Sequence, residues 1–339
     1  MQKFDNYIKG EKKLLIIASH PLDCDSIGTG LILKKYLESL NKKVRLVFPG
    51  KPQNQLREIF EFLPYFNEIE FRNTKEFFKT KLFDVVIFVD GSNLAQFYEN
   101  KKNDNPPNIL LYDKRIHIDH HALQQEKLGV VHIHDPRAAA TAEILIKKII
   151  PCSFIDDKIA TLAYAAIIED TGNFKWNFTP TTFEIASLLI KKGAKFQEII
   201  DKIYASKSKN YLKMLSFALD NCKYDSKLKT IFLFVPHLIF KKEKFDNFAL
   251  RELRTVFRLE LAGKVKNFDR GILIYEQEKG VIEIKATGNN LRNKINLPQL
   301  LTKMGGNGGG HINACGTIIY GRFNQVKKRL LKLLREYQK

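Results

Sequence analysis

Short apolar stretches with the composition of β-strands recur through the first half of the chain, and segments long enough for helices separate several of them. Parallel strands need long crossovers of this kind, whereas antiparallel strands can be joined by tight turns. The pattern therefore predicts an α/β fold, in which helices cover both faces of a parallel sheet. The strands are expected at residues 14–18, 43–48, 84–90, 115–119 and 130–134, and an amphipathic helix at residues 26–40.

The pattern becomes helical from about residue 138 to residue 222, and strands then alternate with helices in the last third of the chain. This predicts a second, smaller α+β domain, because 339 residues exceed the usual size of a single core. The strands of this domain are expected at residues 230–235, 270–276 and 281–286, with helices at 248–261 and 324–337. The expected organisation is a first domain at 1–195, a helical linker at 196–228 and a second domain at 229–339.

Charge is distributed unevenly along the chain. The net charge is +19, and residues 229–339 hold 22 Lys and Arg against 9 Asp and Glu. A basic region favours an anionic partner such as a nucleotide or a nucleic acid, and a merely solvated basic surface is the equal alternative. The four cysteines form no CxxC pair, which argues against a structural zinc site. No apolar run approaches the roughly 18 residues of a membrane helix, so we expect a cytoplasmic protein.

Acidic and histidine side chains follow three of the expected strands and one expected helix. Each has a structural explanation when taken alone, as a helix cap, a turn residue or a buried histidine. Several carboxylates that converge on one sheet edge would repel one another unless cations neutralise them, and ligands of such sheets bind at the carboxyl ends of the strands. We therefore predict a site for two divalent ions, with Mn²⁺ favoured over Mg²⁺ by the nitrogen donors. The candidates are His20, Asp23, Asp25, Asp90, Asp119, His120, His121 and Asp170.

The glycine-rich stretch GGNGGGHINACG at residues 305–316 is the second chemical signal. Successive backbone N–H groups in such a loop can form a site for an anion, and His311 adds a donor. We expect this loop to hold a terminal phosphate of the substrate, and the alternative is a flexible turn before a strand.

Five motifs together resemble a known family. DCDSIG at 23–28, FVDGS at 88–92, DHH at 119–121 and EDTGNF at 169–174 are similar, in this order, to the four motifs of the DHH phosphoesterase superfamily. The glycine-rich stretch is similar to that of the DHH-associated C-terminal domain. The resemblance implies an active site in the cleft between the two domains. It is strongest to the small oligoribonuclease (nanoRNase) branch, which also includes phosphatases of 3′-phosphoadenosine 5′-phosphate.

The resemblance also implies a role for each candidate. Asp90 would bridge the two metal ions, Asp119 would orient a histidine, and His121 would lie over the reacting phosphate. Only two residues separate His20 from Asp23, where the family has three. The implied metal ligands are His20, Asp23, Asp25, Asp90, His120 and Asp170, and the implied substrate-binding residues are Gly308, Gly309, Gly310, His311, Lys285 and Arg292.

The expected function is hydrolysis of short oligonucleotides or of 3′-phosphoadenosine 5′-phosphate by water activated between two Mn²⁺ or Mg²⁺ ions. A homodimer is compatible with this function, and a membrane partner is not expected. The alternatives are a phosphodiesterase for cyclic dinucleotides, a RecJ-like exonuclease and an inactive module that binds nucleotides or RNA.

Overall fold

The chain folds into two compact units, Met1–Ser206 and Lys207–Lys339. The computed structural model describes residues 2–50, 59–99, 105–121, 128–205, 207–306, 309–311 and 313–337. The expected linker at 196–228 is not a separate segment. Helix α7 (Phe196–Ile200) buries Ile199 in the core of the first unit, and α8 (Lys209–Asn221) buries Met214 in a core of the second unit. Each helix therefore packs its apolar face in the core of one unit, α7 in the first and α8 in the second.

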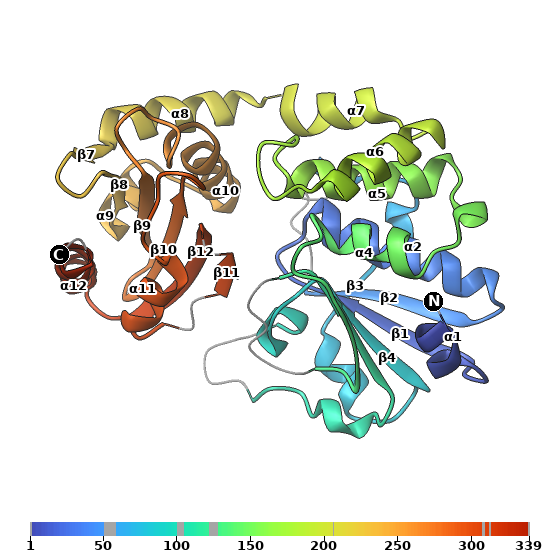
Figure 1. The fold of residues 1–339 in the computed structure, drawn as a ribbon. Coiled ribbons are helices and arrows are strands. Elements are labelled where there is room, and N and C mark those ends of the chain that lie inside the picture. Colours follow the sequence, from blue (N-terminus) through green and yellow to red (C-terminus); the bar gives the residue numbers. More distant parts are fainter. Residues whose placement is uncertain are drawn as a thin grey trace. The chain divides into compact units, whose positions relative to one another are not determined.

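The first unit is built on a six-stranded sheet in which all neighbouring strands are parallel. The strand order is β3-β2-β1-β4-β5-β6 (Figure 1). The chain adds β2 and β3 on one side of β1 and then adds β4, β5 and β6 on its other side. Crossovers leave the sheet in opposite directions at such a point, which opens a site beyond the carboxyl ends of the strands. The strands are β1 (Lys13–Ala18), β2 (Lys43–Pro49), β3 (Glu70–Arg72), β4 (Val85–Val89), β5 (Arg115–Asp119) and β6 (Val131–His134).

The two faces of this sheet are covered differently. On one face, side chains from the α-helices share one core with Leu14, Ile16 and Ile87 of the sheet. On the other face, aromatic side chains such as Phe78 and Phe97 pack against Leu15 and Phe88, and they come from short 3₁₀ helices and loops. The expectation of helices on both faces is therefore met by longer helices on one face and by single turns on the other. The α-helices are α1 (Gln2–Ile8), α2 (Cys24–Ser39), α4 (Thr141–Lys148), α5 (Asp157–Asp170), α6 (Pro180–Lys191) and α7; the 3₁₀ helices are Phe66–Glu68, Thr74–Phe78, Leu94–Phe97, Ile109–Leu111 and Cys152–Phe154, and Asp201–Ala205 is a π-helix.

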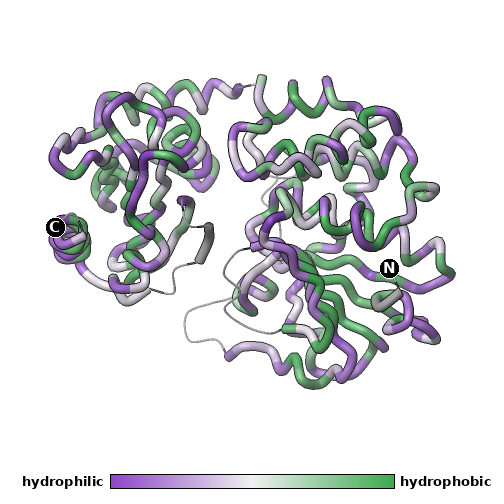
Figure 2. Tube along the Cα trace, viewed as in Figure 1, coloured by the Kyte–Doolittle hydropathy of each residue, from purple (hydrophilic) through white to green (hydrophobic). Residues whose placement is uncertain are grey.

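The central strands of the first sheet are hydrophobic along their length, as the green tube in Figure 2 shows. All five residues of β4 are buried, and so are five of the six residues of β1. Burial on both faces explains why these strands read as continuous apolar runs without alternation. The polar residues of the candidate site follow the carboxyl ends of these strands, such as Asp90 directly after β4.

The second unit has a mixed six-stranded sheet of order β11-β12-β10-β9-β8-β7, in which β8 and β9 are parallel and the other pairs antiparallel. Successive residues of β9 alternate between two cores, with Ile272 and Ile274 on one face and Leu273 and Tyr275 on the other. The prediction of a smaller α+β domain is thus confirmed. Its elements are β7 (Lys223–Asp225), β8 (Thr230–Val235), β9 (Arg270–Glu278), β10 (Val281–Gly288), β11 (Gly309–His311), β12 (Ala314–Tyr320), α8, α9 (His237–Lys242), α10 (Asn247–Val256), the π-helix Phe257–Leu261, α11 (Leu297–Lys303) and α12 (Phe323–Glu336).

Among the described helices, none combines the length and the apolar character needed to cross a bilayer.

Close contact between α2 and α5 gives the first prediction. A Cβ atom on Gly28 would lie 2.9 Å from the backbone oxygen of Leu162 in α5, whereas one on Gly30 would meet only the end of the Leu46 side chain, which can rotate. We expect Gly28→Ala to lower the free energy of unfolding of the first unit by about 1–3 kcal/mol relative to Gly30→Ala. Urea titration followed by the fluorescence of Trp176, the one tryptophan of the chain, measures this unit selectively. Equal stability of the two variants would refute the close helix contact.

Candidate metal centre

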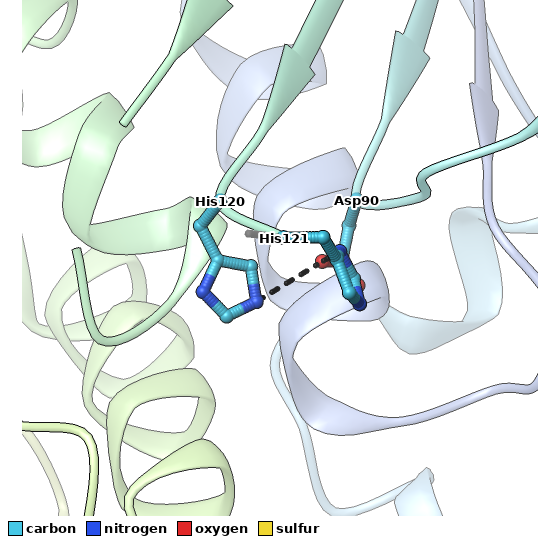
Figure 3. Close-up of side chains that lie close together, drawn as sticks. All are labelled: Asp90, His120 and His121. Atoms are coloured by element: carbon cyan, nitrogen blue, oxygen red, sulfur yellow. Dashed lines mark ion pairs between the residues drawn. The ribbon is translucent and has the colours of Figure 1, made fainter. Parts of the chain in front are cut away.

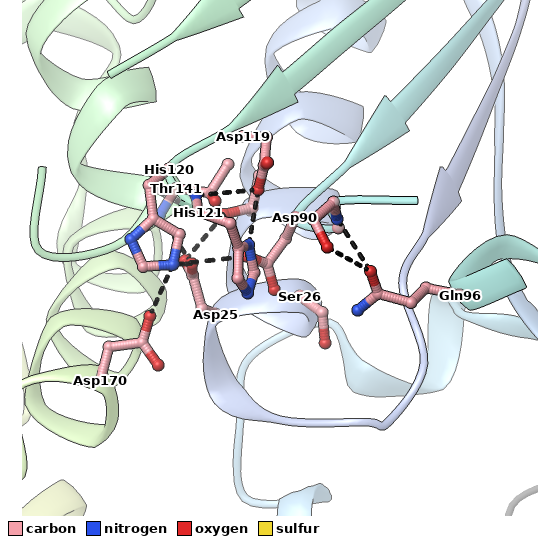
Figure 4. Close-up of polar contacts among 12 residues, drawn as sticks. Asp25, Ser26, Asp90, Gln96, Asp119, His120, His121, Thr141 and Asp170 are labelled. Atoms are coloured by element: carbon pink, nitrogen blue, oxygen red, sulfur yellow. Dashed lines mark hydrogen bonds and ion pairs between the residues drawn. The ribbon is translucent and has the colours of Figure 1, made fainter. Parts of the chain in front are cut away.

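Two strand ends and two helix ends place polar side chains at one edge of the first sheet. Asp90 directly follows β4, and Asp119 is the last residue of β5, with His120 and His121 next in the chain. Asp25 lies in the first turn of α2, which follows β1, and Asp170 is the last residue of α5. Figure 4 shows these side chains converging.

The Asp25 carboxylate is the most firmly held group of the site. Its Oδ2 atom accepts a hydrogen bond from Thr141 N at 2.6 Å, and its Oδ1 atom accepts from Ala142 N at 2.9 Å and from Thr29 Oγ1 at 3.0 Å. The two backbone donors are at the start of α4, where the helix dipole also favours a negative charge. Asp25 is therefore fixed in position although its side chain is almost completely buried.

Asp90 is buried beside Asp25. Its backbone has a φ of 62°, in the left-handed region that few residues other than glycine, asparagine and aspartate adopt. Its Oδ1 atom accepts a hydrogen bond from Thr141 Oγ1 at 2.9 Å. Burial, together with the negative charges of Asp25 and Asp23, raises the pKa of Asp90 well above its usual value. The same repulsion would stabilise a bound cation.

His120 provides the test of whether a cation fits. Its Nδ1 atom lies 3.2 Å from the carbonyl oxygen of Ala138, which can only accept, so Nδ1 carries the proton. Burial and the neighbouring His121 lower the pKa of His120, which favours the neutral ring with a lone pair on Nε2. This lone pair faces carboxylate oxygens, which also carry lone pairs and negative charge. A cation bound between them would convert this repulsion into attraction. The Nε2 atom lies 3.3 Å from Asp170 Oδ2, 3.8 Å from Asp90 Oδ1 and 3.9 Å from Asp25 Oδ2.

Two overlapping groups of donor atoms result. Asp25, His120 and Asp170 form one group, and Asp90, His120 and His121, drawn in Figure 3, form the other. Within each group, the donor atoms lie within 4.8 Å of one another. The donors are carboxylate oxygens and imidazole nitrogens, a combination that suits Mn²⁺. Mg²⁺ prefers sites with oxygen ligands and fewer nitrogens. The expected acidic and histidine site is thus present as a geometric cluster.

His121 pairs with Asp119. The Nδ1 atom of His121 lies 2.7 Å from Asp119 Oδ1. Although burial opposes both shifts, this contact lowers the pKa of Asp119 far below its usual value and raises the pKa of His121. Asp119 therefore orients His121, whereas the backbone of Ala138 orients His120.

His20 and Asp23 lie outside both groups of donor atoms. The carboxylate of Asp23 caps α2 by accepting a hydrogen bond from Ser26 N at 2.8 Å, and the side chain of Ser26 completes the capping box. Burial and the charge of Glu169 raise the pKa of Asp23 to about 7. His20 is exposed, and its backbone N–H donates to Gln96 O at 2.8 Å. The predicted ligand roles of these two residues remain predictions.

Sequence reasoning missed the groups that hold the ligands. Thr141 contacts both Asp25 and Asp90, and Glu169 accepts a hydrogen bond from Cys24 N at 2.5 Å, which joins the end of α5 to the start of α2. The Gln96 side chain accepts from Ser92 N at 2.8 Å and shapes the loop after β4. The sequence offered one signal for Thr141, namely its place at the start of an expected helix. The first N–H groups of a helix have no partner within the helix and can bind a carboxylate.

His117 supports the turn that carries Asp90. Its ring is fully buried, and burial lowers its pKa, so the neutral Nε2–H group donates to Gly91 O at 2.7 Å. A Cβ atom on Gly91 would lie within 3 Å of the Phe97 ring and of Ser19, so the turn is closely packed as well. The residue after Asp90 is therefore fixed both by a hydrogen bond from His117 and by packing against Phe97 and Ser19.

The predicted substrate residues lie in the second unit. Gly309, Gly310 and His311 form β11, which pairs with β12, whereas Gly308 lies outside the described residues. Gly309 is opposite Gly316, where a Cβ atom would lie 2.9 Å from the ammonium nitrogen of Lys285. The Lys285 side chain therefore lies close to Gly316 of β12, the strand between β10 and β11.

Arg292 has structural contacts in the same unit. Its Nη2 atom donates to Gly263 O at 3.0 Å and lies 3.4 Å from Val265 O. These carbonyl partners give the guanidinium a role in holding the loop after the π-helix, and its predicted contact with substrate stays a prediction.

The sequence and the fold both match known proteins. Residues 13–167 match the DHH family, N-terminal domain, which confirms the resemblance seen in the motifs. An uncharacterized protein of Mycoplasma genitalium, MG371, is 24% identical over 98% of this chain and 93% of its own. A probable bifunctional oligoribonuclease and PAP phosphatase NrnA of Streptococcus mutans is 26% identical over 70% of each protein. An exopolyphosphatase-related protein from Bacteroides fragilis has the same fold, with a TM-score of 0.80 and 22% identity over 99% of this chain and 95% of that chain.

The donor cluster predicts metal affinity that depends on Asp90. We expect Asp90→Asn to weaken Mn²⁺ binding by about 10-fold or more, because one carboxylate of the cluster loses its charge. Asp84→Asn is the matched control. Asp84 precedes β4, so it lies at the end of that strand opposite to Asp90, and its carboxylate accepts hydrogen bonds from Lys12 N and Lys13 N. Isothermal titration calorimetry measures both variants, and an unchanged affinity in Asp90→Asn would show that the metal binds elsewhere.

The contact between His117 and Gly91 gives a second prediction for this site. We expect His117→Leu to weaken Mn²⁺ binding by about 10-fold, because the buried Gly91 carbonyl loses its donor and the Asp90 turn is released. His117→Gln keeps an N–H donor and should retain more of the affinity. Calorimetry and thermal unfolding are compared for both variants. A loss of thermal stability in His117→Leu without a loss of Mn²⁺ affinity would limit His117 to packing.

Proposed function

Because residues 13–167 belong to the DHH family, we propose that this chain is a phosphoesterase that depends on divalent metal ions. The observation that carries the proposal is the neutral Nε2 atom of His120 surrounded by three carboxylates, an arrangement that a bound cation would stabilise. The proposed substrates are short oligonucleotides and 3′-phosphoadenosine 5′-phosphate, and the proposed metal is Mn²⁺.

Asp25, Asp90, His120 and Asp170 would hold the metal ions. When bound, such ions lower the pKa of water and neutralise charge on the phosphate oxygens. The hydrogen bonds from Thr29, Thr141 and Ala142 fix the ligand oxygens before substrate arrives, which lowers the reorganisation needed for reaction.

The pair of Asp119 and His121 would supply a proton. The bond to Asp119 raises the pKa of His121 and so favours the protonated imidazole, which can donate to the leaving oxygen of the phosphate ester. Asp119 also fixes the orientation of the ring, as a carboxylate does in other acid–base pairs.

Two further observations support a nucleotide substrate. A relative in Streptococcus mutans is described as a probable bifunctional oligoribonuclease and PAP phosphatase. In the second unit, the Lys285 side chain lies close to Gly316, which pairs with Gly309, so an ammonium group and backbone N–H groups there could bind a phosphate. The strong positive charge of residues 229–339 agrees with an anionic substrate.

The activity of the purified protein tests this function. We expect Mn²⁺-dependent release of mononucleotides from di- and pentanucleotides, or of phosphate from 3′-phosphoadenosine 5′-phosphate, and loss of both with EDTA. Asp119→Asn should lower kcat by about 10²–10⁴-fold, because the protonated His121 is no longer favoured. Asp84→Asn should retain the activity.

A cyclic dinucleotide, pyrophosphate and a long single strand complete the substrate panel. Preference for one of these would replace the proposed substrate class while leaving the metal chemistry intact. Nucleotide binding without hydrolysis of any substrate, at saturating Mn²⁺, would instead identify an inactive binding module.

A further inference from the structure

Two exposed phenylalanine rings and one half-buried ring form a cluster at the connection between α5 and α6. Phe174 and Phe183 are stacked with ring centroids 4.9 Å apart, and Phe178 meets Phe183 edge-on at 5.1 Å. Phe178 and Phe183 are 43% and 47% exposed, which is unusual for rings that contact one another. We call Phe174, Phe178 and Phe183 the phenylalanine cluster.

The phenylalanine cluster is joined to the metal centre through a compact turn. Asp170, whose carboxylate lies 3.3 Å from His120, accepts a hydrogen bond on its backbone oxygen from Trp176 Nε1 at 2.9 Å. The backbone N–H groups of Lys175 and Trp176 both donate to Thr171 O. These bonds keep the segment from Thr171 to Trp176 folded against the end of α5, so the first ring of the cluster lies within one turn of a candidate metal ligand.

The backbone of this turn is strained. Gly172, Asn173 and Phe174 have successive φ angles of 57°, 60° and 58°, and a large side chain such as phenylalanine seldom adopts this conformation. A Cβ atom on Gly172 would lie 2.1 Å from the Trp176 ring, so the indole packs directly on the glycine. Strain of this kind persists where the surrounding structure enforces it and often accompanies function.

We infer that the phenylalanine cluster is a stacking platform for a nucleobase of the substrate whose phosphate binds at the metal centre, an inference that rests on the proposed function. Exposed aromatic rings beside a phosphate site are the arrangement by which proteins hold single nucleotides, and stacking tolerates any base. The platform accepts the base next to the scissile phosphate, because Phe174 follows Asp170 by four residues and stacks on Phe183.

Trp176 provides a direct readout of this stacking. We expect AMP, in the presence of Mg²⁺, to change the fluorescence of Trp176 in a saturable way, and ribose 5-phosphate to bind much more weakly because it lacks the base. The double variant Phe178→Ala with Phe183→Ala should raise the AMP concentration at half-saturation by about 5- to 150-fold, the range of base–aromatic stacking. Its affinity for ribose 5-phosphate should not change.

Two variants separate stacking from folding. Phe178→Leu with Phe183→Leu keeps an apolar surface but removes the flat rings, and it should bind AMP as weakly as the alanine variant. Phe196→Ala removes an exposed phenylalanine from α7 of the same unit and should bind AMP like the wild type. Full AMP affinity in the leucine variant would overturn the inference.

The remaining outcomes distinguish the platform from the proposed function. Base-dependent AMP binding without hydrolysis of any substrate would refute the phosphoesterase and support the platform. Hydrolysis with equal affinity for AMP and ribose 5-phosphate would support the phosphoesterase and refute the platform. A wild-type dimer that the alanine variant converts to a monomer, as measured by light scattering, would show that a second copy of the chain covers the cluster instead.

Discussion

The hydrogen bonds between the Asp25 carboxylate and the start of α4 are the interaction on which the candidate site depends. They join the helix that follows β1 to a helix more than 100 residues later, through donors at 2.6 and 2.9 Å. Thr141 extends the link to Asp90 through its side chain. The carboxylate of Asp25 in α2 and that of Asp90 after β4 are thereby held next to each other, although burial and the charge of Asp25 raise the pKa of Asp90. The arrangement therefore depends on the position of the start of α4 next to the first turn of α2.

The positions of the ligands could be predicted from the sequence because parallel strands impose them. Asp90 and His120 follow buried apolar runs, and the carboxyl ends of parallel strands meet at one edge. The sheet of the first unit and the α+β character of the second were predictable for the same reason, since periodicity reports burial directly.

The contacts that refine the site could not be predicted in this way. Thr141 occupies an ordinary helix start, and the partner of Asp119 depends on ring orientations that spacing does not determine. The division after Ser206 lies inside the expected linker, and the sequence does not locate it more closely, because the core to which an amphipathic helix such as α8 belongs is a tertiary property. Short strands such as β3 and β7, with three residues each, carry too little pattern to be recognised.

The order of the ligands along the chain has a consequence for synthesis. Asp25 emerges from the ribosome early, whereas Thr141 and Asp170 follow more than 100 residues later, and domains fold as their sequence becomes available. A nascent chain that ends before Asp170 has the strands of the sheet but lacks the last carboxylate of the cluster. The metal centre is therefore completed only near the end of the first unit, so a partly made chain lacks the complete set of ligands while it is still folding.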